Sequence, residues 1–531
     1  MRRSTVGKLI LLCILSMVLI TNMMGCSKAS PGGAMETVKE SEQNQEPVIL
    51  RLAGGDYGYP SPYLHYSRGP GSYKMRLIFD SLLERGEKGY IPWLAKNWET
   101  VESGKAYIFT LQEGVQWQDG EAMTPEDVKF SFEYFEKHPP VNNSLFIDGK
   151  SFIEKIEILE GNKLKISVKE PKVVLLEKIG DVRIIPKHIW EKVEDPNKFD
   201  GPEAVIGCGP YILEEYNKEQ GSYRFKAFEN YWGPKQRASA IEFVPVSDAV
   251  LAFEQGEIDM ITASPDILGR YQQDSAYRVL KSPGFWGYNM YFNMNKVPQL
   301  KEKGIRQAIA YAIDREELVE KVARGAGISA SAGYLPKDHI WYNPKVKTYT
   351  HDIEKAKALL AGKTVKFQLL VQNTPQEVRI GELIKLKLEE AGIQVDVKSV
   401  DMKTRDHAIK TGDYEVAVSG YGGWGGDADL IRERYATTIV KDGSASSAVI
   451  PGYKNEAIEE LARAQLNEFD PEKRKKIIYQ LQELIAEEVP QLPLYNTTDS
   501  SVFRPDKYDG WMYMFDHHSL EHSKLSYLER D

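Results

Sequence analysis

The chain contains one long apolar run, and this run lies close to its start. Residues 9–20 are almost entirely apolar and follow a basic head formed by Arg2, Arg3 and Lys8. Such a short run behind positive charges is typical of a secretory signal peptide, whereas a membrane-spanning helix needs about 20 apolar residues. Because no second run of that length occurs downstream, we expect the rest of the chain to fold in water around cores of its own.

The end of the apolar segment carries a short motif. Residues 23–26 read Met-Met-Gly-Cys, which resembles a bacterial lipobox, where the cysteine becomes the lipidated first residue of the mature protein. Residues 27–46 are polar and cannot bury a core, so they predict a flexible tether. We therefore expect a lipoprotein signal peptide over residues 1–25, lipidation of Cys26, and a tether over residues 26–46. An ordinary signal peptide with an incidental cysteine is the alternative.

Length and charge limit what the chain can be. Single hydrophobic cores stop growing beyond roughly 250 to 300 residues, so a chain of 531 residues predicts at least two lobes. The formal net charge is −9, and loss of the three basic residues of the signal segment would make it −12. This acidity, without any basic stripe, argues against nucleic acid as a partner.

Three cysteines are present, and they are distributed unevenly. Cys13 would leave with the signal peptide and Cys26 would carry the lipid, so Cys208 alone would remain in the fold. No intramolecular disulfide is then available, and stability must come from buried apolar surface. Because no paired histidine lies near Cys208 in the sequence, a small buried side chain is favoured over a catalytic nucleophile.

Residue spacing in the first half predicts strands and one well-marked helix. Tyr107, Phe109 and Leu111 recur at every second position, as on one face of a strand. Thr124 followed by Pro125 is a favourable helix start, since threonine caps the first turn and proline fits the first helical position. We expect the first half to be mixed and rich in strands.

The second half alternates between helix and strand patterns. Residues 305–313 place apolar side chains on one helical face, and Asp314 with Glu317 matches a capping box for the next helix. The pattern next predicts a strand at 365–371, a helix at about 375–391 and a strand at 393–397. Another helix and a strand at 414–418 follow. This alternation predicts a largely parallel sheet covered by helices.

Four sequence blocks occur in a fixed order, at residues 93–135, 207–233, 305–327 and 412–430. The first begins WLAKNWETVESGKAYIFTLQEGVQWQDGEAMTPEDVKF, and the last reads GDYEVAVSGYGGWGGDADL. Together they resemble the family 5 extracellular solute-binding proteins. The resemblance implies an α/β, two-lobed periplasmic-binding-protein-like fold of type II, cluster C, with an extra subdomain in the first lobe.

The resemblance also implies limits for the lobes. The first lobe would span residues 47–285. Its core would consist of residues 47–83 and 203–285, and a subdomain would be inserted at about 84–202. The second lobe would span residues 286–490. Residues 491–531 would return to the first lobe, where Leu492 and Leu494 alternate as in a strand.

The resemblance implies a protein that binds a solute without altering it chemically. Proteins of this family serve ABC importers for oligopeptides, dipeptides, nickel chelates or related solutes. We expect this chain to hold a short peptide between its lobes and to deliver it to permease subunits. It would act as a lipid-anchored monomer on the outer face of the cytoplasmic membrane, at the cell surface or in the periplasm, without catalytic residues, cofactor or metal. A nickel chelate or another non-peptide solute, such as a sugar or an opine-like compound, is the alternative ligand, and an exported hydrolase is a distant alternative.

A peptide's amine requires an anion in a cleft that excludes water. In family members that bind peptides, the aspartate of a Trp-x-Gly-Asp motif holds this amine, and the residues from Trp424 to Asp427 match that motif. The resemblance therefore nominates Asp427 for the amine and Trp424 as an aromatic wall. Asp429, in the same loop, is a second candidate. A turn or helix-cap aspartate is the alternative for Asp427.

Further candidates for contact with the ligand come from loops and from the expected crossover between the lobes. They are Tyr57, Tyr59, Tyr63, Tyr421, Tyr288 and Asn289. The first three belong to the loop-like stretch GGDYGYPSPY and could line the cleft wall opposite Asp427. Packing within a core is the alternative for each of them.

Two apparent motifs are set aside. Residues 420–425 satisfy the G-x-G-x-x-G pattern of dinucleotide sites, but Asp427 and Asp429 would repel a pyrophosphate. His517 and His518 suggest a metal site, yet no H-E-x-x-H motif or cysteine cluster supports one. No G-x-S-x-G element or P-loop occurs, and nothing nominates a pair of catalytic carboxylates.

Overall fold

The computed structural model describes residues 48–422, 426–436, 450–515 and 517–530. The described residues belong to one compact unit, Pro47–Asp531. The predicted signal peptide, Cys26 and the tether therefore lie outside the described residues. No helix within the four described ranges is both long enough and apolar enough to cross a membrane.

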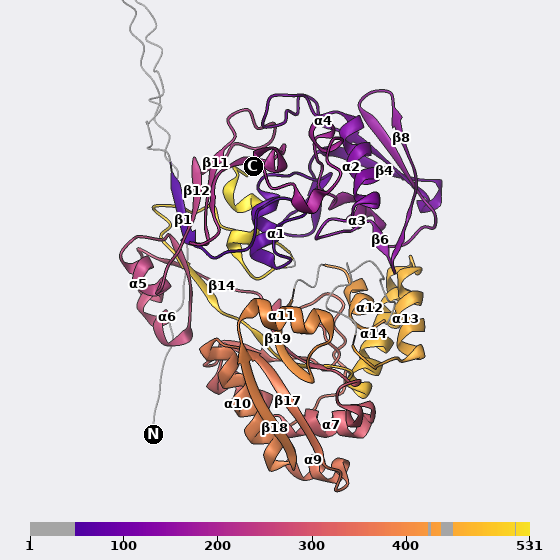
Figure 1. Cartoon of the computed structure of the whole chain (residues 1–531), viewed down its shortest axis with the longest axis vertical. Coiled ribbons are helices and arrows are strands. Elements are labelled where there is room, and N and C mark those ends of the chain that lie inside the picture. Colours follow the sequence, from indigo (N-terminus) through magenta and orange to yellow (C-terminus); the bar gives the residue numbers. More distant parts are fainter. Residues whose placement is uncertain (1–47, 423–425, 437–449, 516, 531) are drawn as a thin grey trace, which may run out of the picture. The chain divides into compact units, whose positions relative to one another are not determined.

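The first lobe is built on a sheet whose edge strand comes from the start of the described chain. The strand order is β1–β12–β11–β10, at Ile49–Ala53, Ala240–Val244, Ser222–Ala227 and Tyr211–Asn217. β1 runs parallel to β12, and the other neighbours run antiparallel. Leu50 and Leu52 are buried at alternate positions of β1, as the two-residue period of a strand requires. Figure 1 shows this pairing between segments that are distant in the sequence.

A second sheet and helix α2 form the inserted part of the first lobe. The strand order is β4–β5–β9–β8, at Ala95–Val101, Ala106–Leu111, Lys163–Val168 and Ile153–Leu159. Tyr107, Phe109 and Leu111 are buried, as their spacing predicts. Helix α2 (Pro125–Lys137) also begins where predicted, because Thr124 and Asp127 cap its first turn reciprocally. The shorter elements of this half are α1 (Gly69–Arg76), β2 (Leu83–Arg85), β3 (Tyr90–Pro92), β6 (Phe146–Ile147), β7 (Lys150–Ser151), α3 (Leu175–Gly180), α4 (Lys187–Trp190), α5 (Ala249–Glu254) and α6 (Pro265–Gln272).

The second lobe contains a six-stranded mixed sheet. The order is β16–β20–β15–β19–β17–β18, at Gly327–Ser329, Leu492–Thr497, Trp286–Phe292, Val416–Gly422, Val365–Gln372 and Ile393–Val400. β17 runs parallel to β18 and β19, whereas the other neighbours run antiparallel. The prediction of a largely parallel sheet is therefore wrong. Strand and helix alternate only in the part of the chain that forms β17, β18 and β19. β15 comes from the start of the second lobe's sequence and β20 from its end.

Helices cover the second sheet with the faces that the sequence predicts. Ile305, Ala308, Ile309 and Ala312 are all buried on α7. The side chain of Asp314 accepts a hydrogen bond from the first turn of α8. The helices of this half are α7 (Lys303–Ala312), α8 (Arg315–Lys321), α9 (Ile353–Leu360), α10 (Pro375–Glu390), α11 (Met402–Thr411), α12 (Asp429–Tyr435), α13 (Glu456–Leu466) and α14 (Pro471–Glu488).

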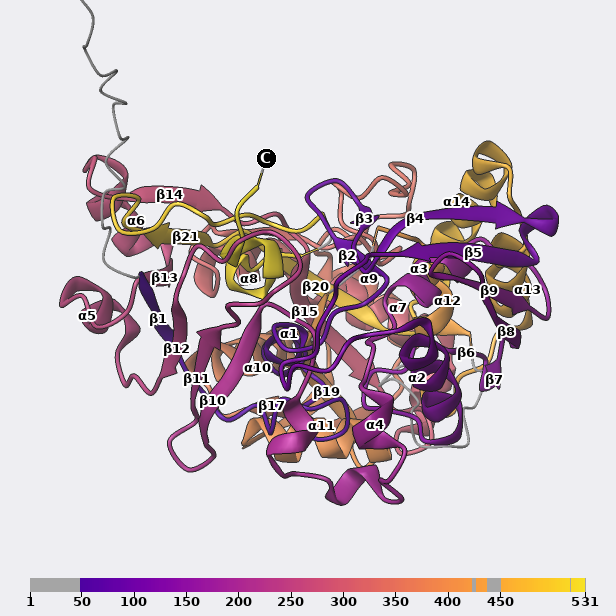
Figure 2. The ribbon, with the colours of Figure 1, turned by 90° about the horizontal axis from the view of Figure 1, so that it is seen from above.

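Two connecting segments link the sheets of the lobes, and they lie side by side. β14 (Arg278–Lys281) precedes β15, and β20 precedes β21 (Ser500–Phe503). β21 pairs with β14 and with β13 (Met260–Ala263) in a three-stranded sheet (Figure 2). Between them, the backbone N–H of Ser282 donates a hydrogen bond of 2.7 Å to the carbonyl of Asp499. The chain thus enters and leaves the second lobe through adjacent connectors.

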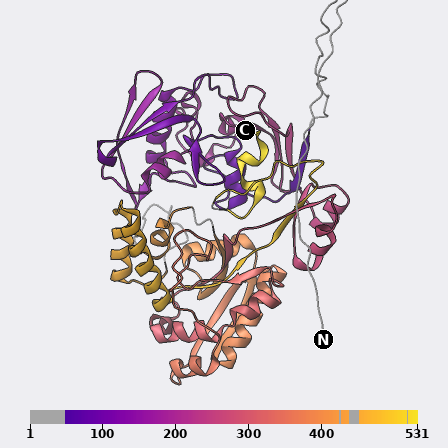
Figure 3. The ribbon, with the colours of Figure 1, turned by 180° about the vertical axis from the view of Figure 1, so that it is seen from behind.

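The end of the chain packs on the first lobe. The C-terminal segment, drawn in yellow, lies among indigo and magenta elements in Figure 3. Lys524 Nζ lies 2.5 Å from Asp80 Oδ1, and Leu528 forms an isolated bridge with Gln236. Strand pairing places β20 in the sheet of the second lobe and β21 in the three-stranded sheet. The residue limits given above for the lobes stay predictions.

Candidate functional site

The loop that follows β1 is held in place by one tyrosine. The hydroxyl of Tyr223 donates to the carbonyl of Gly58 at 2.8 Å and accepts from the N–H of Tyr57 at 2.9 Å. The N–H of Gly54 donates to the carbonyl of Val244 at 2.6 Å. The first sheet therefore fixes the position of Tyr57, one of the predicted ligand contacts.

A cavity of about 220 Å³ lies beside this loop. Its walls come from the loop, α1, β12 and a short 3₁₀ helix, η5 (Leu520–His522), near the C-terminus. The residues that give it its chemical character are Tyr57, Tyr73, Lys74, Phe243, Glu521 and His522. Binding pockets for drug-sized ligands are about 300–1,000 Å³. This cavity is therefore of a size to enclose one end of a ligand.

Lys74 contributes a buried ammonium group to the cavity wall, and the residue is 5% exposed. Its Nζ lies 3.8 Å from the ring centroid of Phe243 and 5.2 Å from that of Tyr57. Within the described part of the chain its hydrogen-bond acceptor is the carbonyl of Pro70, at 3.5 Å. Burial lowers the pKa of Lys74 to about 7. An ammonium group with one long hydrogen bond is available to an incoming anion.

Glu521 and His522 form another part of the wall. The His522 ring stacks on Tyr73 with 4.7 Å between the centroids, and its Nδ1 lies 2.8 Å from Nε2 of His517. Burial raises the pKa of Glu521 and lowers that of His522. The side chain of Glu521 keeps 30% of its surface exposed. The cavity thus offers a cationic side and a carboxyl side.

The histidines set aside as metal ligands belong to a packed cluster of rings. His517 Nδ1 lies 2.9 Å from His518 Nδ1, and His518 stacks on Trp286 with 5.8 Å between the centroids. Across the residues that the structure describes, no group of three His, Cys, Asp or Glu side chains has the geometry to hold a metal ion. These rings hold the C-terminal segment against β15.

Asp427 forms a bidentate ion pair with Arg474 of α14. Both oxygen–nitrogen distances are 2.6 Å, and Oδ1 also accepts from the N–H of Asp429 at 2.7 Å. The side chain of Asp427 keeps 19% exposure, whereas that of Arg474 keeps 7%. The candidate amine anchor thus already has a cationic partner, and a role for Asp427 in ligand binding stays a prediction. Sequence reasoning missed Arg474 because no local motif connects it to the loop.

Asp429 is enclosed by polar partners. Its oxygens accept from Arg432 at 2.7 and 2.8 Å and from the side-chain amide of Gln465 at 2.7 Å. Arg432 also pairs with Asp148 of the inserted subdomain. These bonds satisfy the buried carboxylate and join α12 to the first lobe, and a role for Asp429 in ligand binding stays a prediction.

The two other tyrosines of the first loop differ in their surroundings. Tyr59 is partly exposed, and its hydroxyl donates to the carbonyl of Gly201 at 3.2 Å. Tyr63 is 5% exposed and donates to the carbonyl of His138. Its ring packs on Trp190 with 5.6 Å between the centroids. Tyr63 therefore packs in the core of the first lobe.

The remaining candidates lie in or after the sheet of the second lobe. Tyr288 and Asn289 of β15 and Tyr421 of β19 are all buried. The side-chain amide of Asn289 donates to Gln491 at 2.8 Å. Trp424 lies outside the described residues. The structure thus brings Tyr57 to the cavity and places these three side chains in the interior of the second lobe, where their ligand roles stay predictions.

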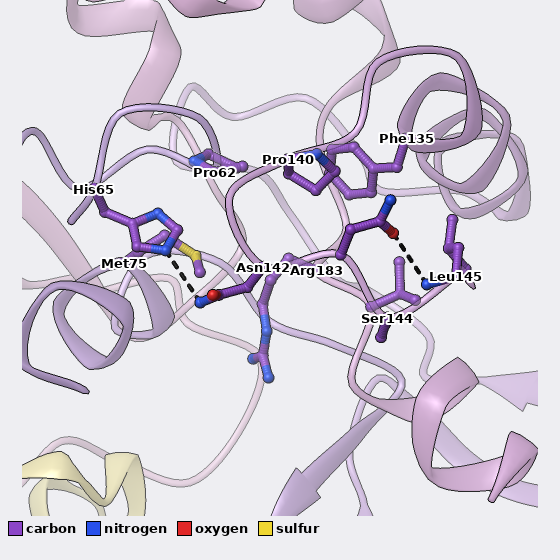
Figure 4. A pocket seen from close by; sticks show the side chains of 11 residues that line it. Pro62, His65, Met75, Phe135, Pro140, Asn142, Ser144, Leu145 and Arg183 are labelled. Carbon is purple, nitrogen blue, oxygen red and sulfur yellow. Dashed lines mark hydrogen bonds between the residues drawn. The ribbon is translucent and has the colours of Figure 1, made fainter. Parts of the chain in front are cut away.

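A smaller cavity of about 20 Å³ lies within the first lobe (Figure 4). His65 Nδ1 lies 2.7 Å from the carbonyl of Ser61, so Nδ1 carries the proton, and Nε2 accepts from the amide of Asn142 at 3.1 Å. Burial lowers the pKa of His65 to about 4, which keeps the ring neutral. A volume of this size holds about one water molecule. The small cavity is therefore a packing feature.

Ion pairs join the loops of the first lobe to α11 of the second. Asp406 accepts from Arg68 Nε at 2.8 Å and from the hydroxyl of Tyr66 at 2.8 Å. Lys403 Nζ lies 2.8 Å from Asp56 Oδ2. Burial opposes ionisation of Asp406, but Arg68 outweighs it and holds the pKa of this carboxyl below its usual value. Asp56 precedes Tyr57, so the loop beside the cavity also joins the lobes.

The architecture defines the class of protein: two α/β lobes joined by adjacent connectors form the periplasmic-binding-protein fold. Residues 89–442 match the model of the bacterial extracellular solute-binding proteins, family 5 Middle. The chain belongs to this family. The resemblance seen in the four sequence blocks is thereby confirmed.

Known proteins of the family resemble the chain over most of its length. The dipeptide-binding protein of Escherichia coli strain K12 is 27% identical over 464 residues, which cover 81% of this chain and 85% of that protein. The ABC transporter-associated periplasmic binding protein DppA from Helicobacter pylori, in complex with peptide STSA, superposes with a TM-score of 0.78 at 22% identity, over 91% of this chain and 98% of that one. NikZ from Campylobacter jejuni, in complex with Ni(L-His), gives a TM-score of 0.75 at 22% identity, over 90% and 97% of the two chains. At these identities the solved structures show the fold alone.

Proposed function

We propose that the chain is the substrate-binding component of an ABC importer and captures a short peptide between its lobes for delivery to the permease. One observation carries this proposal. The loop of residues 54–57 lines the cavity of about 220 Å³ and also pairs with the second lobe through Asp56 and Lys403. A ligand seated there lies against the elements through which the lobes meet. The similarity to a dipeptide-binding protein supports a peptide over other solutes.

Capture works through closure of the lobes. The paired connectors at Ser282 and Asp499 provide a narrow hinge, and the ion pairs of Asp406 and Lys403 form only when the lobes meet. A ligand that contacts both lobes favours the closed state by its difference in affinity for the two states. The permease recognises the closed form.

The location in this proposal follows from the N-terminal motif. Cys26 carries the lipid, and residues 26–46 tether a monomer to the outer face of the cytoplasmic membrane, at the cell surface or in the periplasm. The ligand leaves unchanged, so the protein performs no catalytic step.

Mass spectrometry of ligand released from the purified protein tests the function. We expect a series of short peptides, and addition of such peptides should compact the protein in small-angle X-ray scattering. A released metal chelate or sugar would support the alternative ligands, and turnover of the ligand would support the hydrolase. If no peptide from a broad set compacts the protein, the proposal fails.

Asp406→Asn is expected to weaken peptide binding about 10-fold without changing the ligand preference. The substitution keeps the shape of the side chain but removes the charge that Arg68 and Tyr66 contact from the first lobe. Hydrogen bonds to charged groups contribute about 1.5–3 kcal/mol each, and part of this energy is kept by the amide. Calorimetry with one peptide measures the affinity. The control is Asp413→Asn on the same lobe, since the side chain of Asp413 is 81% exposed. Equal affinities for both variants would show that the Asp406 contacts do not stabilise the closed state.

A further inference from the structure

We infer that Lys74 anchors the carboxylate end of the ligand in the cavity of the first lobe. This inference rests on the proposed function and adds the chemistry of one ligand end and its orientation. Lys74 belongs to none of the sequence motifs that suggested ligand contacts. It is identified by its place in the cavity wall and because, among the residues that the structure describes, no carboxylate forms an ion pair with it.

A charge at the position of Lys74 costs free energy, because the side chain is buried. Lys74 is 5% exposed, and the rings of Phe243, Tyr223 and Tyr57 lie 3.8, 5.1 and 5.2 Å from its Nζ. An apolar side chain would pack there without desolvating a charge. Three aromatic faces stabilise an ammonium group in part, but an aromatic face does not replace a full hydrogen-bond acceptor or an anion. The rings thus hold the Lys74 side chain in place, and its ammonium group keeps N–H donors beyond the one that contacts Pro70.

Two other titratable side chains, Glu521 and His522, face the cavity beside Lys74. No ion pair within 4.0 Å links Lys74 to Glu521 or to any other carboxylate in the described ranges, where the Pro70 carbonyl at 3.5 Å is its acceptor. Burial raises the pKa of Glu521, and the Glu521 carboxyl favours the charged form of Lys74 without forming an ion pair with it. His522 uses Nδ1 with His517, and its ring is held by Tyr73. Lys74 is therefore the cation that a bound carboxylate meets.

The size of the cavity limits how much of a ligand it holds. A cavity of about 220 Å³ receives a ligand terminus and leaves the rest of the ligand outside. The candidate for the amine, Asp427, lies on the second lobe and keeps an exposed edge beside Arg474. A ligand would contact both lobes if its carboxylate met Lys74 and its amine met Asp427. The charges of one zwitterion would then link ligand binding directly to closure.

Matched pairs of ligands test the inference. Each member of a set of tripeptides is compared with its own C-terminal amide, which keeps the shape but removes the negative charge. The wild type is expected to prefer the free acid by on the order of 30-fold or more, the loss typical of one buried charge pair. N-acylated amino acids and their amides form a second series, which carries a carboxylate without a peptide amine.

Two lysine variants separate the anchor from general electrostatics. Lys74→Met keeps the length and lies among apolar rings, so we expect it to fold, and thermal unfolding checks this. It should bind acid and amide nearly equally. Lys355→Met is the control, because Lys355 also lies over a tyrosine ring, at 4.1 Å from the centroid of Tyr311, but on the exposed surface. The acid preference should survive in that variant.

The outcomes distinguish this inference from the proposed function. Tight peptide binding without an acid preference in the wild type would overturn the role of Lys74 and leave the function intact, whether or not the variants fold. An acid preference that persists in Lys74→Met would do the same. If no peptide binds but N-acylated amino acids bind through Lys74, the carboxylate anchor stands and the peptide function falls. If neither series binds, both fail.

Discussion

Replacement of Lys524 with methionine is expected to lower the free energy of unfolding by about 3–5 kcal/mol, because it leaves two buried carboxylates without their cation. Lys524 Nζ lies 2.5 Å from Asp80 Oδ1 and 2.5 Å from Glu84 Oε2. The three side chains are 2%, 0% and 3% exposed. Asp80 also accepts from Trp232 Nε1 at 3.0 Å and from the hydroxyl of Tyr231 at 3.2 Å. The substitution therefore breaks a network at the centre of the first lobe.

Urea unfolding followed by tryptophan fluorescence measures this effect. Lys357→Met is the control, since Lys357 pairs with Glu354 at 2.9 Å on the surface, where the two side chains are 48% and 85% exposed. An exposed pair contributes about 0–1 kcal/mol. Similar losses of stability in both variants would show that the buried network contributes no more than a surface pair.

The network of Lys524, Asp80 and Glu84 should also make the stability of the protein depend on pH in acid. Burial opposes ionisation of Glu84, but Lys524 and Arg183 outweigh it and lower the pKa of this carboxyl from 4.5 to about 2. Because the unfolded chain binds this proton more readily, the stabilisation is complete above pH 4.5 and is lost as the pH falls toward 2. The wild type should lose stability in that window. Lys524→Met, which lacks the main charge that lowers this pKa, should show a weaker dependence.

Asp427→Ala is expected to weaken binding of an amine-bearing ligand by about 2–5 kcal/mol. Asp427 offers a carboxylate edge with 19% exposure, and its partner Arg474 would be left as an unpaired cation. The variant would therefore repel an amine as well as fail to attract one. Calorimetry with a free-amine peptide and its N-acetylated form measures the effect, which should be confined to the free amine.

A double variant shows whether Asp427 acts on the ligand or only on Arg474. Asp427→Ala with Arg474→Met removes both charges, so no unpaired cation remains near the loop. If Asp427 holds the amine, binding should stay weak in the double variant. Recovery of wild-type affinity would assign Asp427 to packing of the loop. Unchanged affinity in the single variant would remove it from the site.

The parts of the fold that could be predicted are those set by neighbours in the sequence. The buried face of α7 follows from the spacing of Ile305 and Ile309, and the start of α2 follows from Thr124 and Pro125. The direction of β15 and β20 in their sheet could not be predicted, because it depends on where distant segments cross between the lobes. Local spacing specifies which face of a strand is buried, but it does not specify the neighbour of that strand.

The same division applies to the candidate site. The loop motif and the early tyrosines nominated Asp427 and Tyr57 from the sequence, and Tyr57 lines the cavity. Arg474, Lys74 and Glu521 gave no signal, because each acquires its importance from a partner or a cavity assembled by folding. A lysine in a short helix and a glutamate near the C-terminus look like ordinary surface charges until their burial is known.

The position of β21 in the middle of its sheet means that this sheet cannot form completely before β21 has been synthesised. This strand lies between β13 and β14, yet it consists of Ser500–Phe503, close to the end of the polypeptide. A chain shortened to end after α14 would leave those two strands with unpaired backbone groups facing a gap. Pairings between such distant segments also form slowly. The three-stranded sheet beside the connectors is therefore incomplete until the segment that follows α14 has been synthesised.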